Sequence, residues 1–413
     1  MGYQQGLSGL AGASNALDVI GNNIANANTV GFKSSTAQFS DMYANSIATS
    51  VNTQIGIGTN LASVQKQFGQ GTINTTNSSL DVAINGNGFF QMSNNGVTTY
   101  SRDGTFQRDK NGFIVNSAGA NLMGYAADKN GVISTAQTVP LQAPTTNIAP
   151  TATTKITAQF NLNSQDTVPT KTPFNATDTT TYNYSTSIQV YDSLGGSQPV
   201  NMYFVKSAAG TWEAYAGVQG GTTTDLGTVT FDSSGAIKST TLPGSTTPTA
   251  SVGQFQFTVP TTDGSTTPQS LTLDLTGTTQ YGGKDGVNNL AQDGYASGTL
   301  TTFSIGPDGK LTGNYSNGQT AVLGQIAIAN FNNPNGLISL GGNQYAETAA
   351  SGVPQISAPG STNHGTLQGS ALENSNVDLT SQLVNLITAQ RNYQANAQTI
   401  KTQQTVDQTL INL

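Results

Sequence analysis

Large side chains recur every seven residues at both ends of this chain, and this spacing constrains the fold more than any other feature. A seven-residue repeat predicts α-helices that pair along a seam of apolar residues. The seam residues are Leu10, Leu17, Ile20 and Ile24 near the start, and Leu379, Leu383, Leu386, Tyr393 and Ile400 near the end. The sequence therefore predicts a terminal coiled-coil domain assembled from residues 1–30 and 370–413.

Both predicted helices carry very little charge. Residues 1–32 contain one charged side chain, Asp18, and residues 379–413 contain three. A coiled coil exposed to water normally places Glu and Lys beside its seam. An ordinary helical hairpin packed on a globular body would explain the seam but not these uncharged outer faces. Because burying charge costs free energy, the composition indicates that neighbours cover the helices on several sides.

The two helices also differ in their local signals. Four glycines between residues 6 and 21 each weaken an isolated first helix by about 1 kcal/mol relative to Ala. This helix is therefore expected to depend on packing. Before the second helix, Asn376 or Asp378 can cap the amino end.

From Leu80 onwards the pattern changes from helical to β. Short apolar and β-branched runs alternate with turns, such as the Asp-Lys-Asn-Gly stretch at 109–112, which is a hairpin signal. Residues 148–279 are very rich in Thr and hold further strands, for example at 211–218. Trp212 is expected in the core of this region.

The simplest domain organisation is nested. Residues 31–71 are expected to form an extended connector. Residues 72–147 and 280–369 form one discontinuous β domain, and residues 148–279 form an outer β domain inserted into it. The predicted fold is therefore mainly β with paired α-helical termini: two nested all-β domains plus a terminal coiled-coil domain.

Composition excludes several classes of protein. The chain has 14 Lys and Arg against 21 Asp and Glu, a net charge of −7, which argues against a nucleic-acid partner. It has no cysteine and a single histidine, His364, which excludes thiolate and multi-histidine metal sites. The glycine-rich stretches at 56–58 and 282–285 lack the rest of a nucleotide-binding motif. We therefore expect no enzyme, no catalytic residue, no cofactor and no metal.

The sequence also bears on location. No apolar run reaches the roughly 18–20 residues of a membrane-spanning helix, and no basic residue precedes Lys33. A secretory signal peptide needs a positive start and a continuous apolar centre. We expect a chain that does not insert into a membrane and is either cytoplasmic or exported without a cleaved signal peptide.

Five longer stretches carry a resemblance to a known family. They are Gly21–Lys33, Leu80–Phe90, Tyr100–Phe106, Gly369–Leu379 and Ala389–Ala397. Together they resemble the bacterial flagellar rod and hook family of axial proteins. The first stretch supplies the family-motif residues Asn22, Asn23, Asn26, Gly31, Phe32 and Lys33. Within the family, the Thr-rich insertion and the overall length are similar to the hook proteins.

The resemblance implies a structural subunit of the flagellar hook. Many copies would polymerise into a curved, flexible tube that couples the motor rod to the filament and transmits torque. The implied partners are other copies of the chain, the distal rod protein, the hook–filament junction proteins, the hook cap and the flagellar type III export apparatus. The implied location is the extracellular hook of the flagellum.

Within such a tube, the paired terminal helices are expected to line the channel, with the two β domains in outer layers. Two alternatives remain open. One is the distal rod protein or another axial flagellar protein. The other is a secreted β-rich adhesin or carbohydrate-binding protein, which the Thr- and Asn-rich β domains suggest by themselves but which leaves the helical ends unexplained.

Overall fold

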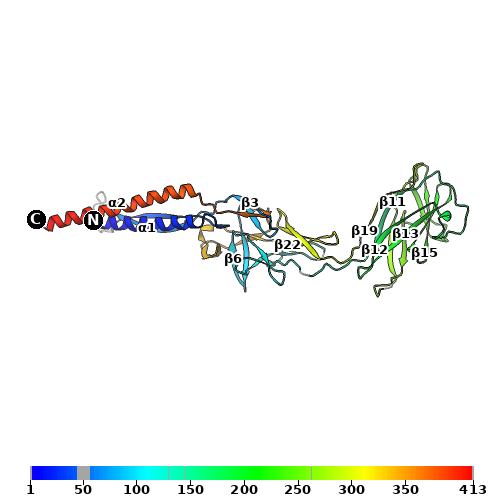
Figure 1. Cartoon of the computed structure of the whole chain (residues 1–413), viewed down its shortest axis with the longest axis horizontal. Coiled ribbons are helices and arrows are strands. Elements are labelled where there is room, and N and C mark those ends of the chain that lie inside the picture. Colours follow the sequence, from blue (N-terminus) through cyan, green and yellow to red (C-terminus); the bar gives the residue numbers. More distant parts are fainter. Residues whose placement is uncertain (1, 44–55, 129, 145, 262, 412–413) are drawn as a thin grey trace. The chain divides into compact units, whose positions relative to one another are not determined.

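A computed structural model describes residues 2–43, 56–128, 130–144, 146–261 and 263–411, which fall into two compact units. The first unit contains Met1–Thr145, Thr301–Asn314 and Thr320–Leu413, and the second contains Thr146–Leu300 and Tyr315–Gln319. Strands dominate both units, and each end of the chain contributes a long helix to the first (Figure 1). The predicted fold class, mainly β with α-helical termini, is confirmed.

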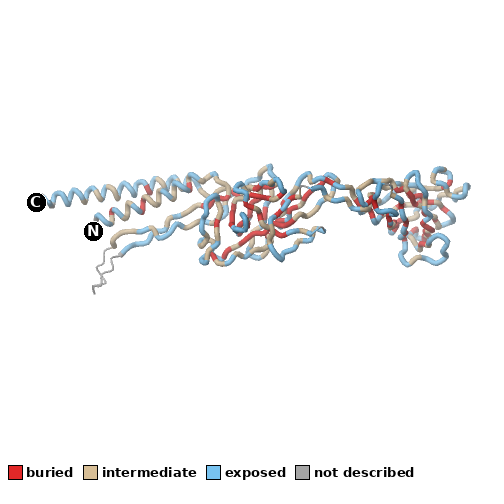
Figure 2. Tube along the Cα trace, turned by 90° about the horizontal axis from the view of Figure 1, so that it is seen from below, coloured by how far each residue is buried: buried red, intermediate tan, exposed pale blue. Residues whose placement is uncertain are grey.

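The terminal helices are α1 (Gly2–Ala25) and α2 (Leu379–Ile411), and they lie side by side (Figures 1 and 2). Of the two predicted caps for the second helix, Asp378 is the one used. Its Oδ1 accepts a hydrogen bond from Thr380 N at 2.9 Å, which satisfies a donor that the first helical turn leaves free.

A long hairpin follows α1. Strand β1 (Ser35–Tyr43) pairs antiparallel with β2 (Gly56–Lys66), and both contact α1. The segment 31–71, expected as an extended connector, thus contains two paired strands. Their sequences are largely polar, and no buried side chain occurs from Ser35 to Met42. The alternation of apolar and polar residues that marks a half-buried strand is therefore missing.

The body of the first unit is a 13-stranded, mostly antiparallel sheet. Its main path runs β20 (Leu300–Ile305), β21 (Lys310–Tyr315), β22 (Thr320–Ile326), β9 (Asn121–Ala126), β5 (Phe89–Asn94), β6 (Val97–Ser101), β25 (Gln344–Ala346) and β24 (Ile338–Gly341). The branches are β7 (Gln107–Arg108), β8 (Ile114–Val115), β10 (Val139–Pro140), β23 (Ile328–Asn330) and β26 (Gln355–Ser357). The hairpin predicted at 109–112 is confirmed, since β7 and β8 pair across it and Gly112 has a φ of +88°.

Two short pairings bring the end of the chain back to its beginning. Strand β28 (Ala371–Glu373) pairs with β3 (Ile73–Thr75), and β27 (Thr366–Gly369) pairs with β4 (Val82–Asn85). As a result, the segment that leads into α2 runs beside the segment that follows the β1–β2 hairpin.

The second unit is a β-sandwich. One sheet orders β12 (Tyr184–Tyr191), β13 (Ser197–Ala208), β14 (Thr211–Val218), β15 (Thr223–Phe231) and β16 (Ile237–Thr241). The other orders β17 (Gln254–Val259), β18 (Gln269–Asp274), β11 (Lys155–Asn161) and β19 (Gly286–Gln292). Apolar residues from both sheets share one core. Trp212 is fully buried there, as predicted.

The second unit extends further along the chain than the expected range 148–279. Strand β19 pairs antiparallel with β11, from Ile156 opposite Gln292 to Asn161 opposite Gly286. Residues 280–300 therefore belong to the sandwich, although the sequence assigned them to the other β domain. β19 is an edge strand with a largely polar, exposed sequence, so it carries no clear strand signal. In the described residues, neither helix is apolar enough over a sufficient length to span a membrane.

Candidate assembly site

Small residues of α1 lie close against α2. A Cβ atom at Gly6 would lie 2.9 Å from Ile400 Cγ1, and one at Gly9 would lie 2.6 Å from Asn396 Oδ1. Ala13 and Ala389 are both buried, at 8 % and 6 % exposure. The glycines that weaken α1 as an isolated helix thus leave room for α2. The sequence signal for this contact is the seven-residue spacing of small residues, with Gly6 and Ala13 at a seam position.

The β1–β2 hairpin packs on α1 through the same kind of residue. A Cβ atom at Gly12 would lie 3.3 Å from Thr59 Cγ2 and 3.5 Å from Phe39 Cε1, so the hairpin rests directly on the helix. Further along, Gln5 Nε2 donates a hydrogen bond to Gly56 O at 2.6 Å. The hairpin and the two helices therefore form one packed group.

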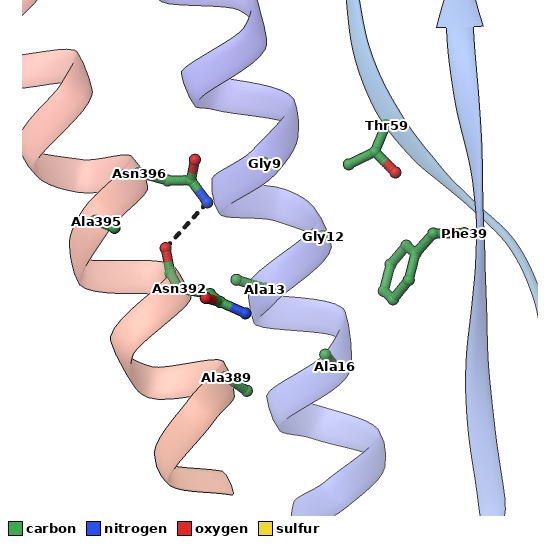
Figure 3. Close-up of a pocket in the computed structure, with 10 residues that line it drawn as sticks. All are labelled: Gly9, Gly12, Ala13, Ala16, Phe39, Thr59, Ala389, Asn392, Ala395 and Asn396. Atoms are coloured by element: carbon green, nitrogen blue, oxygen red, sulfur yellow. Dashed lines mark hydrogen bonds between the residues drawn. The ribbon is translucent and has the colours of Figure 1, made fainter. Parts of the chain in front are cut away.

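A groove is left where these three elements meet (Figure 3). Its volume is about 430 Å³. The lining residues are Gly9, Gly12, Ala13, Ala16, Phe39, Thr59, Ala389, Asn392, Ala395 and Asn396. All of them are uncharged, and most are glycine or alanine. Asn396 points from α2 toward Gly9 of α1, and its Nδ2 donates to Asn392 O at 3.0 Å, so part of the polar lining is already satisfied.

The predicted seam residues are only partly covered. Leu10, Leu17, Ile20, Ile24, Leu386 and Ile400 are half-buried. Leu379, Leu383 and Tyr393 are exposed, at 43 %, 46 % and 39 %. Of the seam residues on α2, Ile400 lies against α1 at Gly6. The assembly role of the nine residues remains a prediction.

One face of α2 carries an apolar patch, which we call the ridge. It consists of Leu379, Leu383, Val384 and Ile387, which are 43–59 % exposed. Residues 379, 383 and 387 are four apart and so lie on one side of the helix. Figure 2 shows how little of α2 is covered: among its described residues, Ala389 alone is buried.

A group of buried polar side chains joins the helices to the β body. Asn23, predicted as a motif residue, is 2 % exposed. Its Oδ1 accepts from Ser35 N and its Nδ2 donates to Ser35 O, both at 2.8 Å. This fixes the end of α1 to the start of β1. Asn376 makes a similar clamp before α2: its Oδ1 accepts from Ser34 N at 2.8 Å and its Nδ2 donates to Gln67 O at 2.7 Å.

The centre of this joint is an ion cluster. Lys33 Nζ donates to Glu373 Oε1 at 2.6 Å and to Gly69 O at 2.7 Å. Glu373 Oε1 also accepts from Gly71 N at 2.8 Å, and Arg102 Nη1 lies 3.7 Å from Glu373 Oε2. Burial lowers the pKa of Lys33, and the nearby Arg102 lowers that pKa further, whereas Glu373 raises it. The single carboxylate of Glu373 thus supplies the negative charge that faces two buried cations, Lys33 and Arg102.

The other motif residues support this joint in different ways. Gly31 has a φ of +68°, and a Cβ atom there would lie 2.6 Å from Asp103 N, so no other residue fits. Phe32 is buried under the ammonium group of Lys66, which lies 4.9 Å from the ring centroid. Asn22 and Asn26 lie outside the joint and bond to each other, with Asn26 Nδ2 donating to Asn22 Oδ1 at 2.8 Å.

Three residues of the joint were not predicted as site residues: Arg102, Glu373 and Asn376. All three lie inside stretches that carry the family resemblance. For Arg102 and Glu373, the available signal was charge in a sequence that is poor in charged residues. No spacing in the sequence could pair these residues with Lys33, because they are distant along the chain.

Comparison with protein families assigns four segments, which together cover most of the chain. Residues 4–33 match the flagella basal body rod protein family, and residues 368–413 match the C-terminal family of the flagellar basal body rod FlgEFG proteins. Residues 83–161 match the flagellar hook protein FlgE/F/G D1 domain, and residues 161–295 match the flagellar basal body protein FlaE D2 domain.

Several curated proteins are similar over their full length. The flagellar hook protein FlgE of Salmonella typhimurium is 42 % identical, and FlgE of Escherichia coli K12 is 41 % identical, with 100 % of both chains covered in each case. FlgE of Treponema pallidum is 33 % identical over 99 % of this chain and 98 % of its own. The crystal structure of Helicobacter pylori FlgE2 covers 73 % of this chain and 100 % of its own, with a TM-score of 0.51 at 16 % identity, which is a likeness of fold.

Proposed function

The chain belongs to the bacterial flagellar hook protein family, and from this premise we propose that its terminal helices form the innermost wall of the hook and hold neighbouring subunits together. The chain is a structural subunit of the hook. The full-length similarity to hook proteins does not favour the distal rod protein, another axial protein or an adhesin.

The observation that carries the proposal is the exposure of α2. This helix has 33 residues, yet Ala389 is the one buried residue among those described. Its exposed residues include large apolar side chains such as Leu383, Ile387 and Tyr393. Apolar surface of this kind is stabilised when it leaves water. A helix with few charges and an uncovered apolar face therefore fits a position among neighbouring copies.

Assembly of this type has to use two different surfaces on each subunit. An open helical polymer is built from heterologous contacts, in which one patch on a subunit meets another patch on the next. We expect the two β units to form outer layers whose polar Thr, Ser and Gly surfaces can slide as the tube bends. A neutral inner wall would let unfolded export cargo pass without binding tightly.

The finer features of the function follow from family membership and remain part of the proposal. The subunits would form a curved tube that couples the rod to the filament and transmits torque. Its partners would be other copies of the chain, the distal rod protein, the junction proteins, the hook cap and the type III export apparatus. Export would occur without cleavage of a signal peptide.

Truncation of α2 tests the proposal. A chain ending at Asp378 keeps the ion cluster and both β units but lacks the exposed helix. We expect it to remain a monomer in sedimentation under conditions in which the full chain forms tubes. A double variant, Leu386→Asp with Ile400→Asp, should lose assembly as well. Val353→Asp is the matched control, because Val353 is 82 % exposed and lies far from both helices in sequence. Tubes formed by the truncated chain would overturn the proposal.

A further inference from the structure

We infer that the groove between α1, α2 and the β1–β2 hairpin receives the ridge of α2 from a second copy of the chain. The groove is the 430 Å³ cavity lined by residues such as Gly9, Ala16 and Ala395, and the ridge is the patch that ends at Ile387. This inference rests on the proposed function, because it names the contact through which subunits would polymerise.

The groove has the size and chemistry of a site for aliphatic side chains. An apolar cavity of about 150 Å³ binds one benzene-sized group, so 430 Å³ has room for two or more. Glycine and alanine of α1 and alanine of α2 line much of the groove, Phe39 adds an exposed apolar wall, and the polar lining residues are Thr59, Asn392 and Asn396. The ridge presents Leu383, Val384 and Ile387 within little more than one helical turn.

The groove and the ridge lie largely on different sides of α2, and only Ala395 approaches the ridge side. Ala389 lines the groove, and Ile387 precedes it by two residues, which is about 200° around a helix with 3.6 residues per turn. A chain therefore cannot insert its own ridge into its own groove. It can, however, offer the groove to one neighbour and the ridge to another. Such a contact repeats indefinitely, as an open polymer requires.

Charge also favours a second copy over an unrelated partner. The groove lining contains no charged residue, and the ridge contains none. Partners that are steered by electrostatic attraction carry complementary charges, which neither surface offers. One chain supplies one groove and one ridge, so every groove in the polymer has a matching ridge.

Cysteine cross-linking tests this contact cleanly, because the chain has no cysteine of its own. Asn392→Cys places a thiol on the groove wall, on a different side of α2 from the ridge, and Ile387→Cys places one on the ridge. A disulfide forms only when the two Cβ atoms approach to about 4 Å. The two variants are mixed in equal amounts, polymerised, oxidised and separated on a denaturing gel. Asn392→Cys mixed with Val353→Cys is the control.

The mixed polymer should give a covalent dimer at a yield at least tenfold above the control. Each variant polymerised alone should give no more dimer than the control. A second pair, Ala16→Cys with Leu383→Cys, repeats the test from the other wall of the groove. The inference is overturned if polymers form and neither pair cross-links, or if the Ile387→Cys variant cross-links to itself. Failure of the unmodified chain to polymerise would instead overturn the proposed function.

Discussion

Lys33 Nζ lies 2.6 Å from Glu373 Oε1, although the two residues are 340 positions apart in the sequence. Both side chains are fully buried. The contact ties the segment after α1 to the segment before α2, so the two helices leave the β body from one fixed point. In the proposed function, this connection would carry torque between the helices and the β body.

Replacement of Glu373 by Gln should strongly destabilise the first unit. The change removes the carboxylate that faces Lys33 and Arg102 and leaves two buried cations without a counter-charge. Breaking a buried ion pair in this way costs about 3–5 kcal/mol. The expected result is a loss of that size in the free energy of unfolding, measured by urea titration with circular dichroism.

An exposed ion pair provides the control for this variant. Lys310 Nζ lies 2.9 Å from Asp308 Oδ2, and both side chains are about half exposed. Asp308→Asn should change the unfolding free energy by no more than about 1 kcal/mol, because surface pairs are screened by water. Equal effects of Glu373→Gln and Asp308→Asn would show that the buried cluster does not hold the joint together.

Glycine positions in α1 should differ sharply in their tolerance of a side chain. Gly9→Leu places a side chain against Asn396 and into the groove, and overpacking typically costs about 1–3 kcal/mol. No atom lies within 4 Å of a Cβ atom at Gly21, so Gly21→Leu should strengthen the helix slightly. Thermal unfolding and polymer yield should fall for the first variant and be preserved for the second. Similar behaviour of the two variants would contradict the close helix contact.

The sandwich should fold as an isolated fragment only with its last strand. A fragment of residues 146–300 contains β19, whereas a fragment of residues 148–279 lacks it and exposes the edge of β11. The chain's single tryptophan, Trp212, is buried in this core and reports its unfolding by fluorescence. We expect a cooperative denaturation curve from the longer fragment and none from the shorter one. A cooperative transition in residues 148–279 would show that β19 is dispensable.

The stability of the sandwich should depend on pH through Asp274. Burial opposes ionisation of this carboxyl, but hydrogen bonds from Lys155 and Thr276 outweigh it and lower the pKa of Asp274 to about 2. A folded-state pKa below the unfolded value of 3.8 stabilises the fold above pH 4. This contribution disappears as the pH falls through about 2. Asp274→Asn should therefore cost roughly 1 kcal/mol at pH 7 and nothing near pH 2, measured by Trp212 fluorescence. An equal cost at both pH values would contradict this origin.

Local patterns predicted the local parts of the fold. The helix cap at Asp378, strand β14 and the core position of Trp212 follow from a few neighbouring residues. The sequence contains no comparable local pattern for contacts between distant segments. Nothing near Lys33 indicates that Glu373 will reach it, since that pairing depends on the return of β28 to β3. Edge strand β19 also lacks a recognisable strand pattern in its sequence, because much of its surface faces water rather than a partner strand.

The candidate site was predicted in position but not in detail. Heptad spacing located both helices, because apolar residues seven apart lie on one face. It also suggested that the large residues would form the contact. In the single chain, small residues such as Gly9 lie close against α2, while Leu383 is exposed. A surface that pairs with another copy and one that pairs within the chain have the same spacing, so sequence alone does not distinguish them.

Electron cryo-microscopy of the polymer with helical averaging tests the central claim most directly, because it locates each part of the subunit relative to the tube axis. The account predicts curved tubes whose innermost wall consists of two helical rods per subunit, α1 and α2, with the β units outside. Tubes whose inner wall is formed by β-sheets would contradict it, as would a preparation that contains discrete monomers alone.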